Sequence, residues 1–157
     1  MSKVYSLKTN QKIPVSLYEA WEYFSNPANL ANLTPDKMGF KTISKHHGEK
    51  MYAGQVIEYK VSPLFGIPLY WMTEIKHVAD KNYFVDEQRF GPFKMWHHQH
   101  HFTATGGGVD MTDTIHYKLP FWFFGDLANW LFVRRQLKGI FAYRFRKVEA
   151  MFGVMKG

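Results

Sequence analysis

Six short segments of strand character follow one another between residues 40 and 119, and this run most constrains how the chain can fold. The segments are 40–46, 54–62, 69–78, 82–90, 94–102 and 109–119, all rich in β-branched and aromatic residues. Short turns with Gly, Pro or Asp separate them, which is typical of an antiparallel meander. The glycines at 106–108 form one such turn, because no Lys-Ser/Thr pair follows them as in a phosphate-binding loop.

Helical patterns stand on both sides of this run. Residues 4–15 alternate as a first strand, and Ser16 with Glu19 forms a capping box for a helix over SLYEAWEYF. A second short helix is expected between Pro27 and Pro35. Beyond Pro120 the apolar residues recur at a helical period.

This last pattern predicts one long amphipathic helix of about seven turns. Asp126 is its expected N-cap, and Gly139 lies in its middle, where it could mark a kink or a close approach. The expected apolar stripe comprises Leu127, Leu131, Phe141, Phe145, Val148 and Phe152. The predicted fold class is α+β, in the order β-α-α-β6-α, with a seven-stranded antiparallel sheet curled around the long helix.

The segment KMWHHQHHF (94–102) carries four histidines within five positions. Because side chains alternate along a strand, Trp96, His98, His100 and Phe102 share one face, and His97, Gln99 and His101 share the other. The cluster therefore divides into two pairs of histidines. A metal ion would need a third ligand from elsewhere in the chain.

Composition narrows the possible classes of protein. The 157 residues fit one domain, 1–157, and 14 Phe, 9 Tyr, 5 Trp and 8 Met indicate either a ring-rich core or a cavity. Without cysteine, disulfides and thiolate chemistry are excluded. Neither an apolar signal-peptide segment nor a membrane-spanning run is present, so we expect a cytoplasmic protein without stable membrane insertion.

The positive charge is concentrated near the C-terminal end. Residues 118–157 carry eight Lys and Arg against Asp126 and Glu149, which is +6 of the total +7. Such a segment can bind nucleic acid or anionic lipid, but it is more often the solvated face of a helix. Nucleic acid is therefore not an expected partner, and the oligomeric state is open.

Three stretches of the chain resemble the SRPBCC superfamily, the START-like, helix-grip group that includes polyketide cyclase/dehydrase-like and lipid-transport proteins. They are residues 13–35, 84–102 and 110–121. The second and third resemble patterns of a bacterial branch of ligand-binding SRPBCC proteins without an assigned reaction. The matching positions are Phe84, Asp86, Gln88, Gly91, Pro92, Phe93, Trp96, His98, His100, Phe102, Asp113, Ile115, Tyr117, Leu119 and Pro120.

The resemblance implies an apolar pocket between the sheet's concave face and the long helix. Its expected lining comprises Trp71, Thr73, Trp96, His98, His100, Phe102, Met111, Asp113, Ile115, Tyr117 and Phe141, with Ile75 beside Thr73. On the strand over 82–90, either Phe84, Asp86 and Gln88 or Tyr83, Val85 and Glu87 point inward. The aromatic segment 122–132 is expected to pack under the rim of the sheet and line the pocket mouth, although an exposed docking surface is the alternative.

Three interpretations of the polar groups stay open. His98 and His100 can pair with Asp113 or Asp86 and simply satisfy each other beside a ligand pocket. A histidine–carboxylate pair can also act in acid/base catalysis, with His98, His100, Asp113 and Tyr117 as candidates and Tyr117 polarising a carbonyl. Two histidines and a carboxylate can also bind a metal. We expect the first, with neither a metal nor a cofactor, and expect His97 and His101 to be exposed.

The predicted function is therefore the binding or transport of a hydrophobic small molecule, such as a lipid, an isoprenoid or an aromatic polyketide-like compound. A cyclase/dehydrase-like enzyme that uses the same cavity is the alternative. A basic-helix binder of anionic membranes or nucleic acid is the second alternative.

Overall fold

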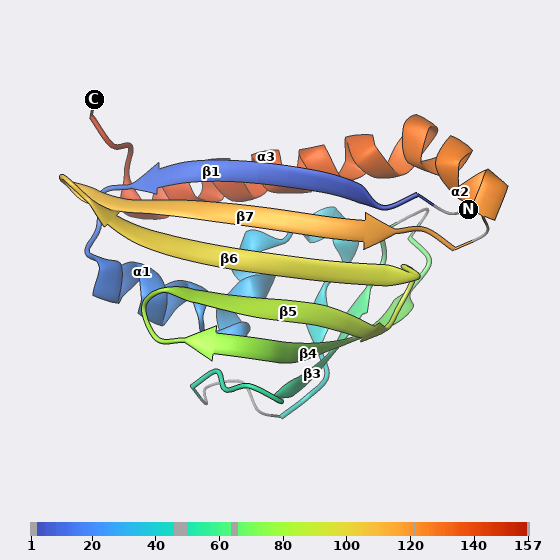
Figure 1. The fold of residues 1–157 in the computed structure, drawn as a ribbon, viewed down its shortest axis with the longest axis horizontal. Helices are drawn as coiled ribbons and strands as arrows, with labels where there is room; N and C mark the ends of the chain where they lie inside the picture. Colours follow the sequence, from blue (N-terminus) through green and yellow to red (C-terminus); the bar gives the residue numbers. More distant parts are fainter. Residues whose placement is uncertain (1–2, 46–49, 64–65, 121, 157) are drawn as a thin grey trace.

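A curved antiparallel sheet wraps around a long C-terminal helix in the computed structural model, which describes residues 3–45, 50–63, 66–120 and 122–156 (Figure 1). The sheet has seven strands in the order β1-β7-β6-β5-β4-β3-β2, and every neighbouring pair is antiparallel. The strands are β1 (Tyr5–Ile13), β2 (Lys41–Thr42), β3 (Val56–Val61), β4 (Leu69–Ala79), β5 (Tyr83–Phe90), β6 (Met95–Thr105) and β7 (Gly108–Lys118). The predicted α+β helix-grip fold is confirmed.

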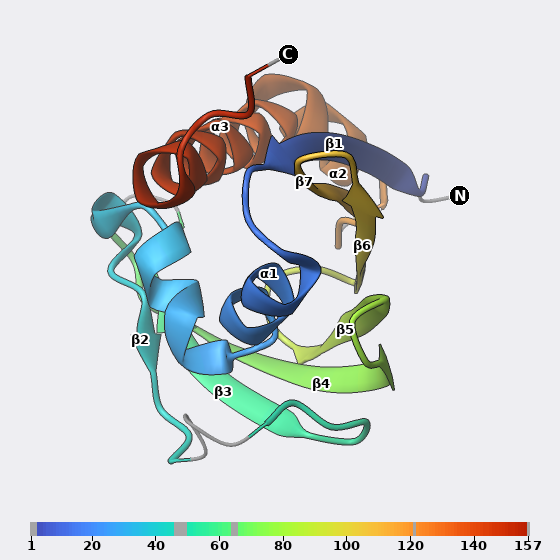
Figure 2. The ribbon, with the colours of Figure 1, turned by 90° about the vertical axis from the view of Figure 1, so that its left-hand side faces the viewer.

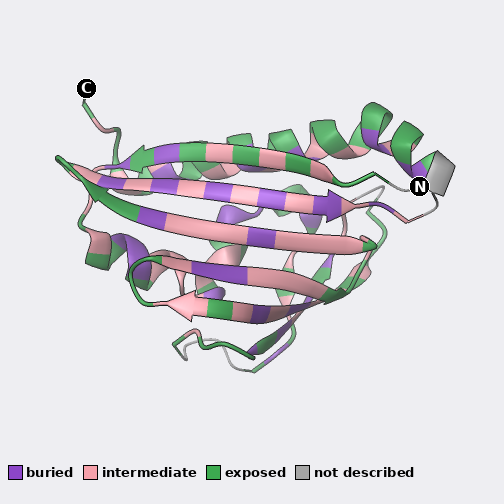
Figure 3. Cartoon of the chain, viewed as in Figure 1, coloured by how far each residue is buried: buried purple, intermediate pink, exposed green. Residues whose placement is uncertain are grey.

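The sequence alternation places one face of each strand toward the helix. Along β7 every second residue from Val109 to Tyr117 is buried, and the residues between them are half-buried (Figure 3). This is the pattern expected where one face of a strand packs on the core. The segment 40–46 is the exception, because its strand is limited to Lys41 and Thr42, while His46 lies outside the described residues.

A two-residue turn at Gly106 and Gly107 joins β6 to β7, as the glycine run predicts. Gly108 begins β7 directly beside the end of β1. A Cβ atom at Gly108 would lie 2.1 Å from the carbonyl oxygen of Ile13, so only glycine allows the two strands to approach this closely.

Short helices close one end of the curved sheet (Figure 2). Helix α1 (Leu17–Phe24) begins with the predicted capping box, in which the Ser16 side chain accepts from the Glu19 amide and Glu19 accepts from the Ser16 amide. The second predicted helix is a 3-10 helix, η1 (Pro27–Leu33), and a further 3-10 turn, η2 (Asp36–Met38), follows it. The side chains of Ala20 and Trp21 anchor α1 in the core.

The C-terminal helical region is interrupted by a π-helical turn. It consists of α2 (Trp122–Ala128), the π turn η3 (Asn129–Val133) and α3 (Arg134–Phe152). Asp126 is not the N-cap, because the helix already begins at Trp122, and its carboxylate instead accepts a hydrogen bond from the Tyr5 hydroxyl. Gly139 does not mark a close approach, because a Cβ atom there would meet no atom within 4 Å.

The π turn also changes which side chains the helix buries. A π turn contains one residue more than an α-helical turn, so it rotates the residues before it relative to those after it. Phe141 and Val148 are buried as predicted, but Leu127, Leu131 and Phe145 are exposed. The buried face of α3 instead includes Leu137. No helix within the described parts of the chain is long and apolar enough to cross a membrane.

Candidate functional site

A cavity of about 570 Å³ lies between the concave face of the sheet and α3. Its lining is mostly apolar and comes from the helices at one end, from strands β3 to β7, and from the C-terminal helical region. Side chains that line it include Tyr23, Leu30, Leu33, Ile57, Tyr59, Val61, Trp71, Ile75, Phe93, Trp96, Leu137, Ile140 and Phe141. The volume and the apolar lining are those of a small-molecule site.

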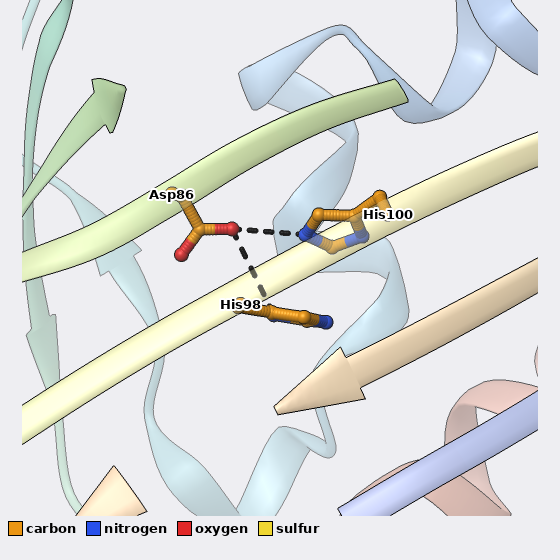
Figure 4. A group of neighbouring side chains, drawn as sticks. All are labelled: Asp86, His98 and His100. Atoms are coloured by element: carbon orange, nitrogen blue, oxygen red, sulfur yellow. Dashed lines mark hydrogen bonds and ion pairs between the residues drawn. The ribbon is translucent and has the colours of Figure 1, made fainter. Parts of the chain in front are cut away.

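Four polar side chains on the cavity wall form one hydrogen-bonded group, which we call the tetrad: Asp86, His98, His100 and Asp113. Asp86 Oδ2 lies 2.9 Å from His100 Nε2 and 3.7 Å from His98 Nδ1 (Figure 4). On the other side, Asp113 Oδ1 lies 2.8 Å from His98 Nε2 and 2.7 Å from His100 Nδ1. Both carboxylates therefore contact both imidazoles.

The strand register brings the tetrad together. Asp86 on β5 pairs with His98 on β6, and His100 on β6 pairs with Asp113 on β7. Residues on the same face of adjacent strands, directly or diagonally opposite, are close enough for side-chain contact. This register also decides the open question about β5, because Phe84 and Asp86 line the cavity. Gln88 instead bonds both backbone polar groups of Phe93.

The contacts of the two imidazoles favour particular protonation states. Both ring nitrogens of His100 lie close to a carboxylate oxygen, and an ionised carboxylate only accepts. This arrangement favours the imidazolium form of His100, which can donate from both nitrogens. His98 donates from Nε2 to Asp113, and its Nδ1 is too far from Asp86 for a hydrogen bond, so the neutral ring suffices there.

The pKa values of the four groups shift in agreement with this assignment. Burial acts to raise the pKa of Asp113, but the charge and hydrogen bond of His100 and the hydrogen bond of His98 outweigh it and hold that pKa well below its usual range. For Asp86, burial also acts to raise the pKa, but the hydrogen bond from His100 and the charges of the two histidines and Arg144 together outweigh it and lower the pKa. Burial and the charge of His100 lower the pKa of His98. Burial opposes protonation of His100, yet the two carboxylates raise its pKa.

Aromatic rings and one cation surround the tetrad. The Phe84 ring stacks on His100 with centroids 4.1 Å apart, and the two imidazoles lie 3.7 Å apart. The Phe141 ring contacts His98 from the helix side, with ring centroids 5.9 Å apart. The guanidinium carbon of Arg144 lies 5.0 Å from the centroid of the Phe141 ring. Arg144 also lines the cavity, and its charge favours ionised Asp86. The tetrad is thus a charged centre in a ring-lined wall.

Most side chains that the sequence analysis selected for the pocket line this cavity: Trp71, Thr73, Trp96, His98, His100, Met111, Asp113 and Phe141. Phe102, Ile115 and Tyr117 are buried elsewhere. Phe102 packs against Trp21 and Phe24, whereas Ile115 lies under α3. The Tyr117 hydroxyl donates to Asn129 Oδ1 at 2.6 Å in the π turn, and Tyr117 does not line the cavity.

Several lining residues were not predicted from the sequence. Ile57, Tyr59 and Val61 alternate on β3, and this alternation was a usable signal. On α3 the spacing of Leu137, Ile140, Phe141 and Arg144 at i, i+3, i+4 and i+7 marks the cavity face. The lining from η1, including Leu30 and Leu33, had no such signal, because a short 3-10 helix has no long apolar period.

The tetrad has the donor set for a metal ion as well as for hydrogen bonds. Single ligand atoms of Asp86, His98 and His100 all lie within 4.8 Å of one another. Two imidazoles and a carboxylate suit zinc or iron, and Asp113 would then orient both rings from behind. The same nitrogens serve the hydrogen-bonded arrangement equally well, so the geometry alone does not select the metal.

The outward-facing histidines of β6 are half-buried rather than exposed. His97 Nδ1 lies 2.7 Å from Glu87 Oε1, and Gln99 connects the other nitrogen of His97 to His101. The Tyr83 ring stacks on His101 with centroids 5.3 Å apart. Neighbouring side chains on the convex face partly cover these two rings, so His97 and His101 are less exposed than predicted.

The aromatic segment 122–132 only partly follows the expectation that its rings pack under the sheet. Phe124, Gly125 and Ala128 line the cavity. However, the side chains of Trp130 and Phe132 are 77% and 58% exposed. The side chains of Trp122 and Phe123 lie outside the described part of the structure.

The arrangement of strands and helices is similar to that of several solved structures. Protein CV1439 from Chromobacterium violaceum superposes with a TM-score of 0.72 at 9% identity, over 96% of this chain and 98% of that one. Ginseng major latex-like protein 151 from Panax ginseng gives 0.68 at 18% identity, over 95% and 97%. The protein TTHA0849 from Thermus thermophilus gives 0.64 at 16% identity, over 94% and 99%.

These similarities identify the class of protein by its fold alone. The chain has the helix-grip fold of the birch-pollen allergen type, which is consistent with the SRPBCC resemblance of its sequence. No protein-family model and no curated protein matches the chain.

Proposed function

We propose that this chain is an SRPBCC-type binding or transport protein for a hydrophobic small molecule that carries a hydrogen-bond donor. The observation that carries this proposal is the cavity of about 570 Å³, whose apolar wall contains the charged tetrad. An apolar cavity of this size gains free energy by burying a ligand's apolar surface, at about 25 cal/mol for each Å². A lipid, an isoprenoid or an aromatic polyketide-like compound suits the surrounding rings.

The tetrad restricts which polar group the ligand can place beside it. Asp86 and Asp113 are ionised and therefore offer only acceptor oxygens to the cavity. A ligand hydroxyl can donate to such an oxygen, whereas a ligand carboxylate in direct contact with the same oxygen would meet a like charge. An apolar alcohol or phenol is therefore favoured over a fatty acid at this position.

Native mass spectrometry of freshly purified, untagged protein tests the proposal. An excess of a few hundred daltons over the denatured mass would identify a carried apolar ligand. An excess equal to a transition-metal mass would instead support the Asp86–His98–His100 metal site. If the protein carries nothing, titration with apolar alcohols and with fatty acids of equal length should still show preferred binding of the alcohols. Equal or absent binding of both would contradict the proposal.

A pair of tryptophan variants tests whether the cavity is the binding site. Ile140→Trp adds a large ring to the cavity wall, and we expect it to weaken binding at least about tenfold by occupying the ligand's volume. Ala150→Trp adds the same ring to an exposed position of the same helix and should leave binding unchanged. Equal effects of the two substitutions would place the ligand outside the cavity.

A cyclase/dehydrase-like enzyme is the second candidate, and the tetrad is the observation that favours it. A neutral imidazole, His98, lies beside an imidazolium and two carboxylates in an apolar cavity, which suits proton transfer to and from a bound ligand. His98→Ala distinguishes the two functions. If His98 is the acid/base group, turnover should fall by about 10²–10⁴-fold, whereas a binder should keep most of its ligand affinity.

A further inference from the structure

The second half of α2, the π turn and the start of α3 expose a row of apolar residues followed by a row of basic ones. Leu127, Trp130 and Leu131 are 51%, 77% and 43% exposed. Arg134, Arg135 and Lys138 continue the row at the same spacing of three and four residues and are also exposed. We call these six residues the docking stripe. The π turn η3 contains Trp130 and Leu131, so the docking stripe is defined by the exposure of its six residues and not by a single helix face.

The docking stripe lies beside one end of the cavity. Phe124, one turn before the stripe, lines the cavity and is also 73% exposed, so the cavity wall reaches the molecular surface here. Pro63, which follows β3, lies against the start of α3, because the Gln136 side chain donates to its carbonyl oxygen. Pro63 also lines the cavity. Apolar residues from two parts of the chain therefore border this end of the cavity.

Charge distinguishes this surface from an ordinary apolar patch. Between residues 122 and 148 the chain carries six Lys and Arg residues and a single acidic residue, Asp126. Asp126 accepts the hydrogen bond from Tyr5, so its charge is engaged beside β1. The basic half of the stripe thus faces solvent with a strong positive excess. Such a surface attracts anionic headgroups at about 1 kcal/mol for each basic residue near the membrane, or roughly fivefold in binding.

We propose that the docking stripe binds peripherally to a lipid bilayer that contains anionic headgroups, with this end of the cavity turned toward the lipid. Trp130, Leu127 and Leu131 enter the headgroup–acyl boundary, and the three basic residues bind phosphates of neighbouring headgroups. The proposal goes beyond ligand binding, since docking requires only the surface and not the contents of the cavity. It concerns binding at the bilayer surface only.

Two other partners fit the docking stripe less well. Nucleic acid would satisfy Arg134, Arg135 and Lys138 but would leave the aliphatic and indole side chains of the stripe in water. A second copy of the chain would either bring the two basic rows together, with like-charge repulsion, or place each basic row over apolar residues. A bilayer surface offers both the apolar and the anionic partner in the same order.

Vesicle co-sedimentation tests the proposal. The full chain should pellet with vesicles of phosphatidylglycerol and phosphatidylcholine, and only weakly with vesicles of pure phosphatidylcholine. Arg134→Glu/Arg135→Glu should reduce the partition coefficient at least about 25-fold, from roughly fivefold for each lost basic residue. Trp130→Ser should reduce it about tenfold, and its exposed position means that the fold should not change.

A matched control separates docking from net charge. Lys41→Glu/Lys60→Glu makes the same change of charge on the exposed, paired positions of β2 and β3, and we expect less than about twofold weakening. Circular dichroism of each variant verifies that it is folded. Equal loss in the control and the stripe variants, or equal pelleting with both kinds of vesicle, would overturn the proposal. So would a dimer in sedimentation equilibrium that Trp130→Ser converts into a monomer without any vesicle binding.

Discussion

The two faces of β6 carry the same kinds of side chain, but the concave face is more deeply buried than the convex face. On the concave face, His98 and His100 bond the buried carboxylates Asp113 and Asp86, and Phe84 stacks on His100. On the convex face, His97 bonds Glu87 and the Tyr83 ring stacks on His101. The contacts are alike, but the Asp113 side chain is 4% exposed and the Glu87 side chain 35%. Burial, and not residue type, decides which histidines form a charged centre.

Removing one carboxylate from each face is the strongest test of this comparison. Asp113→Ala leaves two buried imidazoles without their shared acceptor, and we expect it to lower the free energy of unfolding by about 3–5 kcal/mol. Glu87→Ala breaks a partly exposed pair and should cost less than about 1 kcal/mol. Urea unfolding followed by tryptophan fluorescence measures both. Similar losses for the two variants would show that the faces are energetically alike.

The pH dependence of stability should sharpen the comparison further. The lowered pKa values of Asp86 and Asp113 give stability that is present above the unfolded value of about 3.9 and is lost as pH falls through the folded values. The raised pKa of His100 gives stability that is present below the unfolded value of about 6.5 and is lost as pH rises through the folded value. Asp86, Asp113 and His100 together should therefore stabilise the fold most between about pH 4 and 6.5.

The variant His100→Gln tests whether His100 stabilises the fold in this pH range. Its difference in unfolding free energy from the natural chain should be largest between about pH 4 and 6.5 and should shrink on both sides. His98, whose pKa is lowered, destabilises both proteins in acid and so largely cancels. Unfolding titrations at a series of pH values give the two curves. A difference that does not vary with pH would mean that His100 is not an imidazolium in the folded protein.

The stacked rings offer a smaller test. Phe84→Leu removes a buried ring from the His100 face and leaves a small cavity, at an expected cost of about 1–3 kcal/mol. Tyr83→Leu removes the corresponding ring on the convex face, and we expect less than about 1 kcal/mol. Thermal unfolding at matched pH compares them. A larger effect for Tyr83→Leu would reverse the ranking of the two faces.

The smallest expected effect is at Gln99, which connects His97 and His101 on the convex face. Gln99→Ala removes the two hydrogen bonds that the Gln99 side chain makes to His97 and His101. Water can replace them, so the free energy of unfolding should change by no more than about 0.5 kcal/mol. Differential scanning calorimetry is sensitive enough to detect a larger change, which would indicate that the convex row is structurally important.

The sequence predicted the parts of this molecule that depend on local periodicity. Alternation along 94–102 separated His98 and His100 from His97 and His101, and the Ser16–Glu19 spacing predicted the start of α1. The partners of the histidines were predicted only as alternatives, because pairing depends on strand register. The register of β5 against β6 is fixed by contacts across the sheet, and no single segment encodes it.

The C-terminal helix shows where periodicity fails. Leu127 and Leu131 have the spacing of a buried stripe, yet both are exposed, because the π turn follows Leu127 and contains Leu131. A π turn has no sequence signature in this segment comparable to a capping box or a proline. The exposure of Trp130, on which the proposed docking stripe depends, could therefore be recognised only from the folded chain.

The pairing of β1 with β7 has a consequence for the order in which the molecule assembles. Tyr5 pairs with Tyr117, so the first strand can join the sheet only after the last strand has been synthesised. The tetrad, in contrast, lies within residues 86–113, on three strands that follow one another as hairpins. Contacts near in sequence form faster than distant ones. During synthesis the charged centre can therefore assemble before α3, which supplies one wall of the cavity, has been made.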